Sequence, residues 1–65
     1  MQIIKRNGQF NVIDDYGYNV CKIVKNDGKY SVNMNGQFIS TGNLNSCLTV
    51  VYKTFAPKSV QLIGW

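Results

Sequence analysis

The stretch KNDGKYSVNMNGQFIS, residues 25–40, contains two turn signals, Asp27-Gly28 and Asn35-Gly36, separated by six residues. Asp-Gly and Asn-Gly pairs favour the centre of a type I′ hairpin turn, because both central positions need a positive φ. The second signal opens the tetrapeptide NGQF, which also occurs at residues 7–10 with Asn7-Gly8 at its start. Three turns of one kind predict a meander of short antiparallel strands.

The register of the central hairpin follows from its two-residue loop. Ile23 then pairs with Val32, and the next turn pairs Val32 with Ile39 on the same face. Successive side chains of a strand point to opposite faces, so the alternation can be checked directly. One face collects a coherent apolar set: Cys21, Ile23, Tyr30, Val32 and Met34. We therefore expect strands around residues 18–25 and 29–40.

The N-terminal hairpin has two possible registers. A strict two-residue loop pairs Ile4 with Asn11 and Lys5 with Phe10. A β-bulge that pairs Ile4 with Phe10 would separate apolar from polar side chains better between the two faces. The face sorting favours the bulge, and both registers remain open at this point.

After Gly42 the hydrophobic period changes from two to that of a helix. The spacing i, i+3, i+4, i+7, i+11 predicts a helix over residues 44–55, on the stripe Leu44, Cys47, Leu48, Val51 and Phe55. Asn43 or Asn45 can cap its start, and Ala56-Pro57 ends it. The β-branched run over residues 49–51 is the argument for a strand instead.

The last apolar segment, Ser59–Ile63, predicts a strand that returns to the sheet before Gly64-Trp65. The complete prediction is a single α+β domain over residues 1–65. It has an antiparallel meander of four to five short strands, one helix packed on one face, and a C-terminal strand.

Composition limits the class of protein. The chain has 65 residues, seven Lys+Arg and three Asp, a net charge of +4, and neither Glu nor His. A basic excess favours anionic partners, although Arg6 is the only arginine available for bidentate contacts. No apolar run approaches the ~18 residues of a membrane span, so we expect a cytoplasmic protein without a membrane partner. Eight Asn, six Ile and six Lys against one Ala are typical of an AT-rich gene, as in a low-GC bacterium or its phage.

The residue types present argue against an enzyme. Without His or Glu, general acid–base catalysis lacks its usual participants, and two cysteines without His make no zinc set. Nothing resembles a phosphate-binding loop. We expect no catalytic residue, metal, cofactor or small-molecule substrate. Cys21 and Cys47 are expected to be buried, reduced and slow to react with thiol reagents.

Residues 28–55 also show a pattern found in DNA-binding domains. Gly28-x-Tyr30 lies in a predicted strand, and Gly42 leads through Leu44 to Asn45-Ser46 at the predicted helix start. This run resembles the plant ethylene-response-type domain and the arm-binding domain of phage integrases. The resemblance implies three antiparallel strands followed by a helix, and DNA binding through the sheet. Where those families carry Arg and Trp, this chain carries Ser31, Asn33, Gln37 and Ser40.

Two binding roles remain. The face opposite the apolar set mixes aliphatic, aromatic and polar side chains with little charge, which is the usual make-up of a protein contact surface. We expect a module that docks on a partner protein as a modulator or inhibitor, or that forms a homodimer, through Val20, Lys22, Val24, Ser31, Asn33 and Phe38. The alternative is a DNA- or RNA-binding sheet that uses Lys5, Arg6, Lys22, Lys25 and Lys29.

Plainer interpretations compete with both roles. The lysines can serve solubility and protect strand edges. Phe38 and Trp65 can be core residues, if the N-terminal hairpin or the tail through Trp65 folds over the sheet face opposite the apolar set.

Overall fold

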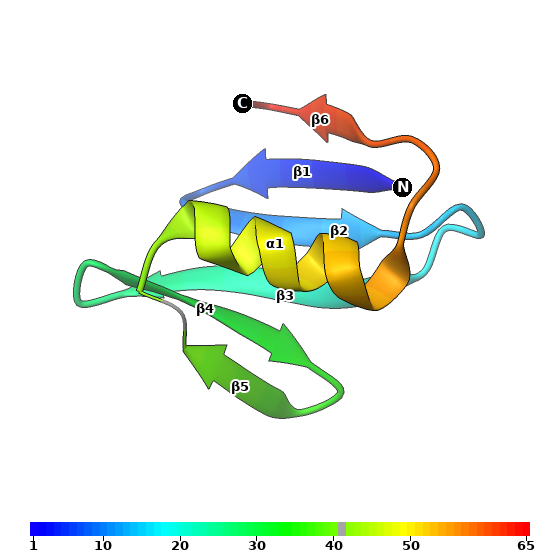
Figure 1. Cartoon of the computed structure of the whole chain (residues 1–65). Helices are drawn as coiled ribbons and strands as arrows, with labels where there is room; N and C mark the ends of the chain where they lie inside the picture. The colour runs from blue at the N-terminus through cyan, green and yellow to red at the C-terminus, as the bar shows by residue number, and fades with distance from the viewer. Residues whose placement is uncertain (41) are drawn as a thin grey trace.

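The computed structural model of the protein is a six-stranded sheet with one helix on one of its faces (Figure 1). The structure describes residues 1–40 and 42–65, with Ser40 described by its backbone. The strands are β1 (Gln2–Arg6), β2 (Gln9–Ile13), β3 (Asn19–Asn26), β4 (Lys29–Met34), β5 (Gln37–Ser40) and β6 (Gln61–Ile63), and the helix is α1 (Leu44–Phe55). The α+β prediction is confirmed, with five strands in the meander and the C-terminal strand as the sixth.

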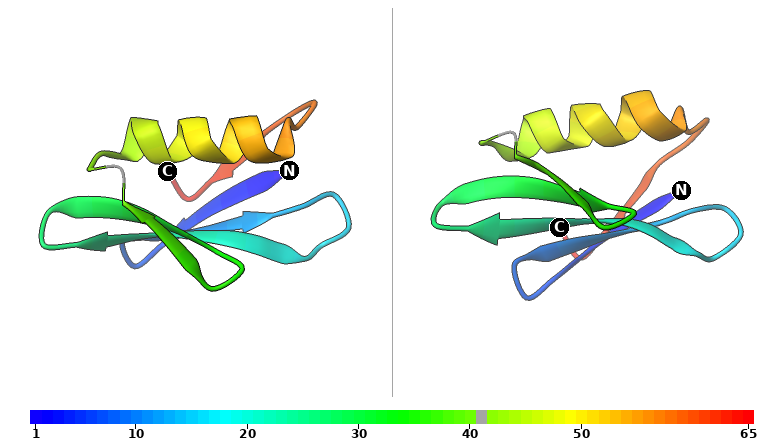
Figure 2. Two further views of the ribbon diagram at one scale, coloured as in Figure 1. Left: turned by 60° about the horizontal axis from the view of Figure 1, so that its bottom comes forward. Right: turned by 90° about the horizontal axis from the view of Figure 1, so that it is seen from below.

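The strands lie in the order β5-β4-β3-β2-β1-β6. Neighbours among β1 to β5 are antiparallel, whereas β6 runs parallel to β1 at the far edge. To reach that edge the chain passes from β5 through α1, which lies across one face of the sheet (Figure 1). In the part of the chain that the structure describes, the side views show no helix on the opposite face (Figure 2).

The three hairpin turns have the backbone that the sequence predicted. Asn7, Asp27 and Asn35 have φ values of 53°, 53° and 52°, and each is followed by a glycine that also has a positive φ. Ile23 pairs with Val32, and Val32 pairs with Ile39. The predicted register of the central hairpins is therefore confirmed.

The bulge that we favoured in the N-terminal hairpin is wrong. Ile4 pairs with Asn11 and Lys5 with Phe10, as a strict two-residue loop requires. The reason is that Ile3, not Ile4, faces the core, where it pairs with Val12. A strict register keeps both of these side chains fully buried.

A β-bulge occurs instead between β2 and β3. Val12 pairs with Cys21, but Ile13 pairs with Asn19, so Val20 is the extra residue on β3. The bulge changes the direction of the Val20 side chain, which packs against the buried cluster.

The core lies between the sheet and α1. The buried cluster takes two residues from the helix and six from the inner face of β1 to β4: Ile3, Phe10, Val12, Cys21, Ile23, Val32, Cys47 and Val51. Among the described residues no helix is long and apolar enough to cross a bilayer.

Helix α1 begins and ends where the sequence predicted. The Asn43 side chain accepts a hydrogen bond of 2.8 Å from the backbone N–H of Ser46, which satisfies a free donor of the first turn. At the other end Ala56 adopts a left-handed conformation and donates to the Tyr52 carbonyl at 2.9 Å, before Pro57. The strand alternative for residues 49–51 is wrong, because burial of Val51 against the sheet outweighs its β propensity.

Candidate functional site

The sheet face away from α1 is the first candidate site, and we call it the open face. One cross-strand row crosses this face through all six strands: Ile63, Ile4, Asn11, Lys22, Asn33 and Phe38. Val24 and Ser31 pair in a neighbouring row. These residues alternate with the buried ones along each strand, so the sheet itself places them on the side without a helix (Figure 2).

Exposure and charge differ along the open face. Ile4, Asn11, Asn33 and Ile63 are half-buried by their neighbours, whereas Phe38 is 68% exposed. Among the described strand residues of this face, every charged side chain is cationic: Arg6, Lys22 and Lys29. The surface therefore combines an exposed aromatic ring, aliphatic side chains, amides and positive charge.

Five of the six residues predicted for protein docking lie together on the open face: Lys22, Val24, Ser31, Asn33 and Phe38. Val20 does not belong with them, and its prediction needs correction. It is the extra residue of the β-bulge, and it lines a hollow at the C-terminal end of α1 together with Met34 and Phe55. Sequence alternation misplaced Val20 because a bulge shifts the alternation by one residue. The side chain of Ser40, a strand position in the resemblance, lies outside the described residues.

The second candidate site is at the end of the sheet where the β1–β2 and β3–β4 turns lie, and we call it the basic end. The Lys5 ammonium lies over the Phe10 ring, 6.0 Å from its centroid, and the Lys25 ammonium lies 5.7 Å from the centroid of Tyr30. The Phe10 and Tyr30 rings are themselves 6.3 Å apart. Each ammonium group therefore lies over an aromatic ring while the lysine itself stays exposed.

Trp65 completes the basic end. Its indole Nε1 donates a hydrogen bond of 3.1 Å to the carbonyl oxygen of Ile3, and its ring centroid lies 4.9 Å from that of Phe10. The ring is 47% exposed, so one part rests on Phe10 and the rest faces solvent. Trp65 thus lies on the side of Phe10, not over Phe38, and it leaves the open face uncovered. The sequence carried no signal for this contact, since Trp65 meets residues more than fifty positions away.

The five cationic residues predicted to bind nucleic acid are distributed over both candidate sites. Lys5 and Lys25 share the α1 side of the sheet with their paired aromatic residues, whereas Arg6, Lys22 and Lys29 are on the open face. All of them except Lys22 flank the two turns of the basic end. This end therefore carries Lys5, Arg6, Lys25 and Lys29 against one carboxylate, Asp27.

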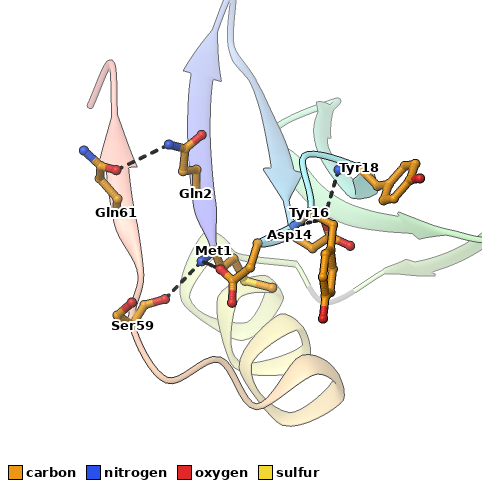
Figure 3. A network of polar contacts seen from close by, with 8 residues as sticks. Met1, Gln2, Asp14, Tyr16, Tyr18, Ser59 and Gln61 are labelled. Atoms are coloured by element: carbon orange, nitrogen blue, oxygen red, sulfur yellow. Dashed lines mark hydrogen bonds and ion pairs between the residues drawn. The ribbon is translucent and has the colours of Figure 1, made fainter.

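The loop between β2 and β3 presents two exposed tyrosines. The carboxylate of Asp14 accepts hydrogen bonds of 2.9 Å from the backbone N–H groups of both Tyr16 and Tyr18 (Figure 3). These hydrogen bonds hold the loop as a turn, while the tyrosine rings point away from each other into solvent. Asp15 forms an ion pair of 2.6 Å with the Met1 ammonium, and its side chain is mostly exposed, so the pair adds little stability.

Both cysteines are buried, and neither forms a disulfide. Burial raises the pKa of Cys21 to about 11, because desolvation disfavours the thiolate; the nearby Cys47 adds to the rise, and a backbone hydrogen bond from Lys22 opposes it. Cys21 is therefore protonated at neutral pH and is a poor nucleophile. Among residues 1–40 and 42–65, no three His, Cys, Asp or Glu side chains are grouped so that they could hold a metal ion.

Comparison with known proteins finds no matching protein family, no matching curated protein and no matching solved structure.

Proposed function

We propose that the protein is a non-enzymatic binding module that docks on an acidic surface of a partner protein through its open face. The observation that carries this proposal is the row across all six strands, which ends in the exposed ring of Phe38 and includes no carboxylate. An aromatic anchor surrounded by aliphatic and amide groups is typical of the centre of a protein interface. Arg6, Lys22 and Lys29 at its border favour a partner of negative charge.

The biological setting belongs to the same proposal. A small basic module without catalytic residues suits a modulator or inhibitor of a host protein. The AT-rich composition favours a phage or another mobile element as its source. Two cysteines that form no disulfide are typical of a reducing compartment, which favours the cytoplasm.

Phe38→Thr tests the docking surface. We expect the partner that copurifies with the wild-type protein to bind the variant at least ~30-fold more weakly, since loss of a central aromatic anchor costs about 2 kcal/mol or more. Thr retains β propensity and the native ring is exposed, so the free energy of unfolding should change by less than ~1 kcal/mol. Titration calorimetry and denaturant unfolding measure the two quantities.

Tyr18→Thr is the matched control for Phe38→Thr. Tyr18 is 71% exposed, close to the 68% of Phe38, but it lies in the β2–β3 loop away from the open face. The control should bind the partner like the wild-type protein. The docking proposal is wrong if Phe38→Thr binds normally, or if it unfolds the protein while Tyr18→Thr does not.

A second candidate function is binding of single-stranded nucleic acid at the basic end. The observation that favours it is the half-exposed Trp65 ring held on Phe10, with the Lys5 ammonium over Phe10 and the Lys25 ammonium over the neighbouring Tyr30. Aromatic rings on which bases can stack, beside cations that contact the phosphates, are the usual features of single-strand binding sites. The resemblance to DNA-binding domains placed this function on the strand side chains of the sheet face, which is a different surface.

The double substitution Lys5→Gln and Lys25→Gln tests this function. Each phosphate contact removed should lower the slope of log affinity against log salt by about 0.7. Binding of an oligothymidylate, followed by quenching of the fluorescence of Trp65, gives that slope. The protein has a single Trp, so the signal reports this site alone.

The double substitution Lys53→Gln and Lys58→Gln is the matched control, because it lowers the net charge by the same amount as Lys5→Gln with Lys25→Gln. Lys53 is in the last turn of α1, and Lys58 lies beyond it, so both are away from the basic end (Figure 1). If both double variants lose affinity equally, the binding is nonspecific charge attraction. If the wild-type protein shows no quenching at low salt, this second function is excluded.

A further inference from the structure

Strand β5 is an edge of the sheet, and among residues 1–40 and 42–65 no strand pairs with the outer side of its backbone. The pair that closes a two-residue hairpin, here Met34 and Gln37, is a hydrogen-bonded pair, and such pairs alternate with pairs that are not. Gln37 and Ile39 therefore direct their N–H and C=O groups to β4. Phe38 and Ser40 direct theirs outward, where another strand can bind.

This edge lacks three of the usual protections against a second strand, although β5 is only four residues long. Natural edge strands are commonly guarded by Lys, Pro or a bulge, and β5 has none of these. The neutral region is longer than the strand, because residues 30–52 contain no charged side chain. Two apolar side chains on this strand are also exposed, Phe38 on the open face and Ile39, at 39%, on the α1 side.

From these features of the edge we infer that β5 pairs with the β5 strand of a second copy of this chain. The two strands run antiparallel, and the two-fold axis of the dimer passes between their two Ile39 residues. In this register Phe38 pairs with Ser40 of the other copy, and Ser40 with its Phe38, so every outward-directed backbone group of the two residues is bonded. Ile39 faces its own counterpart in a pair that is not hydrogen-bonded, with Cα atoms about 4.5 Å apart.

The surroundings of β5 favour a second copy as the occupant. The surface at a two-fold contact must be complementary to itself. In the register centred on Ile39 this condition is met, because the outward-directed groups of Phe38 face those of Ser40 in the other copy, and the reverse. Each chain carries a net charge of +4, but the edge where the copies meet is neutral, so repulsion is weakest there. Figure 1 shows that β5 lies outside the part of the sheet that α1 covers, so the helices of the two copies do not meet.

This inference does not rest on the proposed docking function. A two-fold axis perpendicular to the sheet keeps the open faces of both copies on one side. The dimer would have one continuous sheet with two open faces and two basic ends. Loss of the dimer and loss of partner docking can therefore be measured separately.

Sedimentation equilibrium and amide hydrogen exchange test the inference on the purified protein. The mass should rise with concentration from 7.3 kDa to twice that value, within a range that reaches ~1 mM. Over the same range the amides of Phe38 and Ser40 should become protected from exchange. The amides of Gln37 and Ile39, which already bond to β4, should be protected at every concentration.

Charges at the two-fold axis give a sharper test. Ile39→Lys alone and Ile39→Asp alone should both be monomeric, because like charges face each other at the axis. An equimolar mixture of the two variants should associate again, because opposite charges then meet. Leu62→Lys is the matched control, since Leu62 is 50% exposed on β6 at the other edge, and it should associate like the wild-type protein.

Several results would overturn the inference. A wild-type protein that stays monomeric up to ~1 mM excludes the dimer. Association that survives in Ile39→Lys excludes this edge, and association lost in Leu62→Lys assigns it to β6. A mixture of the Lys and Asp variants that stays monomeric, with both variants folded by circular dichroism, excludes the register through Ile39.

Discussion

Ile23→Ala is expected to remove a large fraction of the protein's free energy of unfolding. Ile23 is fully buried at the centre of the sheet, between Phe10 on β2 and Val32 on β4. Truncating a buried Ile to Ala costs about 2–5 kcal/mol, through lost burial and the cavity that remains. A chain of this length has a total stability of roughly 3–10 kcal/mol, so the loss is a large fraction of the whole. Denaturant unfolding followed by circular dichroism measures it.

Ile4→Ala is the matched control for Ile23→Ala, because it removes the same atoms from the other face of the same sheet. Ile4 is half-buried on the open face, where it pairs with Ile63 and Asn11. A partly exposed side chain leaves no enclosed cavity, and we expect a loss of about 1 kcal/mol. Equal losses for the two variants would show that the open face is covered and that the assignment of the two faces is wrong.

Gly64→Ala is expected to release Trp65 from the sheet. A Cβ atom at this position would lie 2.6 Å from the carbonyl oxygen of Lys5, which is a backbone atom and cannot move aside. The segment has to shift away from β1, and Trp65 then loses its contact with Phe10 and its hydrogen bond to Ile3. We expect a loss of about 1.5–3 kcal/mol and a shift of the Trp fluorescence to longer wavelength.

Gly8→Ala is the control that distinguishes the effect of this clash from the loss of stability that any alanine with a positive φ causes. Gly8 has a φ of +75°, close to the +79° of Gly64, but a Cβ there would meet nothing within 4 Å. It should lose about 1–2 kcal/mol and leave the emission of Trp65 unchanged. If Gly64→Ala matches Gly8→Ala in both stability and emission, the close approach of Gly64 to Lys5 does not exist.

The prediction of hairpins and helix succeeded where the responsible interactions are local. A positive φ at Asp27 and Gly28 depends on those two residues, and a two-residue loop then sets the pairing of Ile23 with Val32. The helix over residues 44–55 follows from a stripe whose members are neighbours along the chain. Five of the residues proposed for docking follow from the same hairpin register.

The N-terminal hairpin shows where local information stops. Ile3 and Ile4 are equally apolar, and only the position of α1 decides that Ile3 is buried and that Ile4 faces outward. The bulge at Val20 is likewise a tertiary feature, since the Val20 side chain packs against the buried cluster. Neither choice is visible in a pattern of alternating residues.

By itself, the amino-acid sequence determined the turns, the register of the central strands, the helix and the neutral stretch over residues 30–52. The tertiary structure decided the parallel position of β6, the contact of Trp65 with Phe10, the face that stays open and the edge that stays unpaired. The physical reason is the range of the interactions. Backbone conformation and hydrophobic period act over a few residues, whereas the place of β6 depends on a crossover through α1 and on contacts between the two ends of the chain.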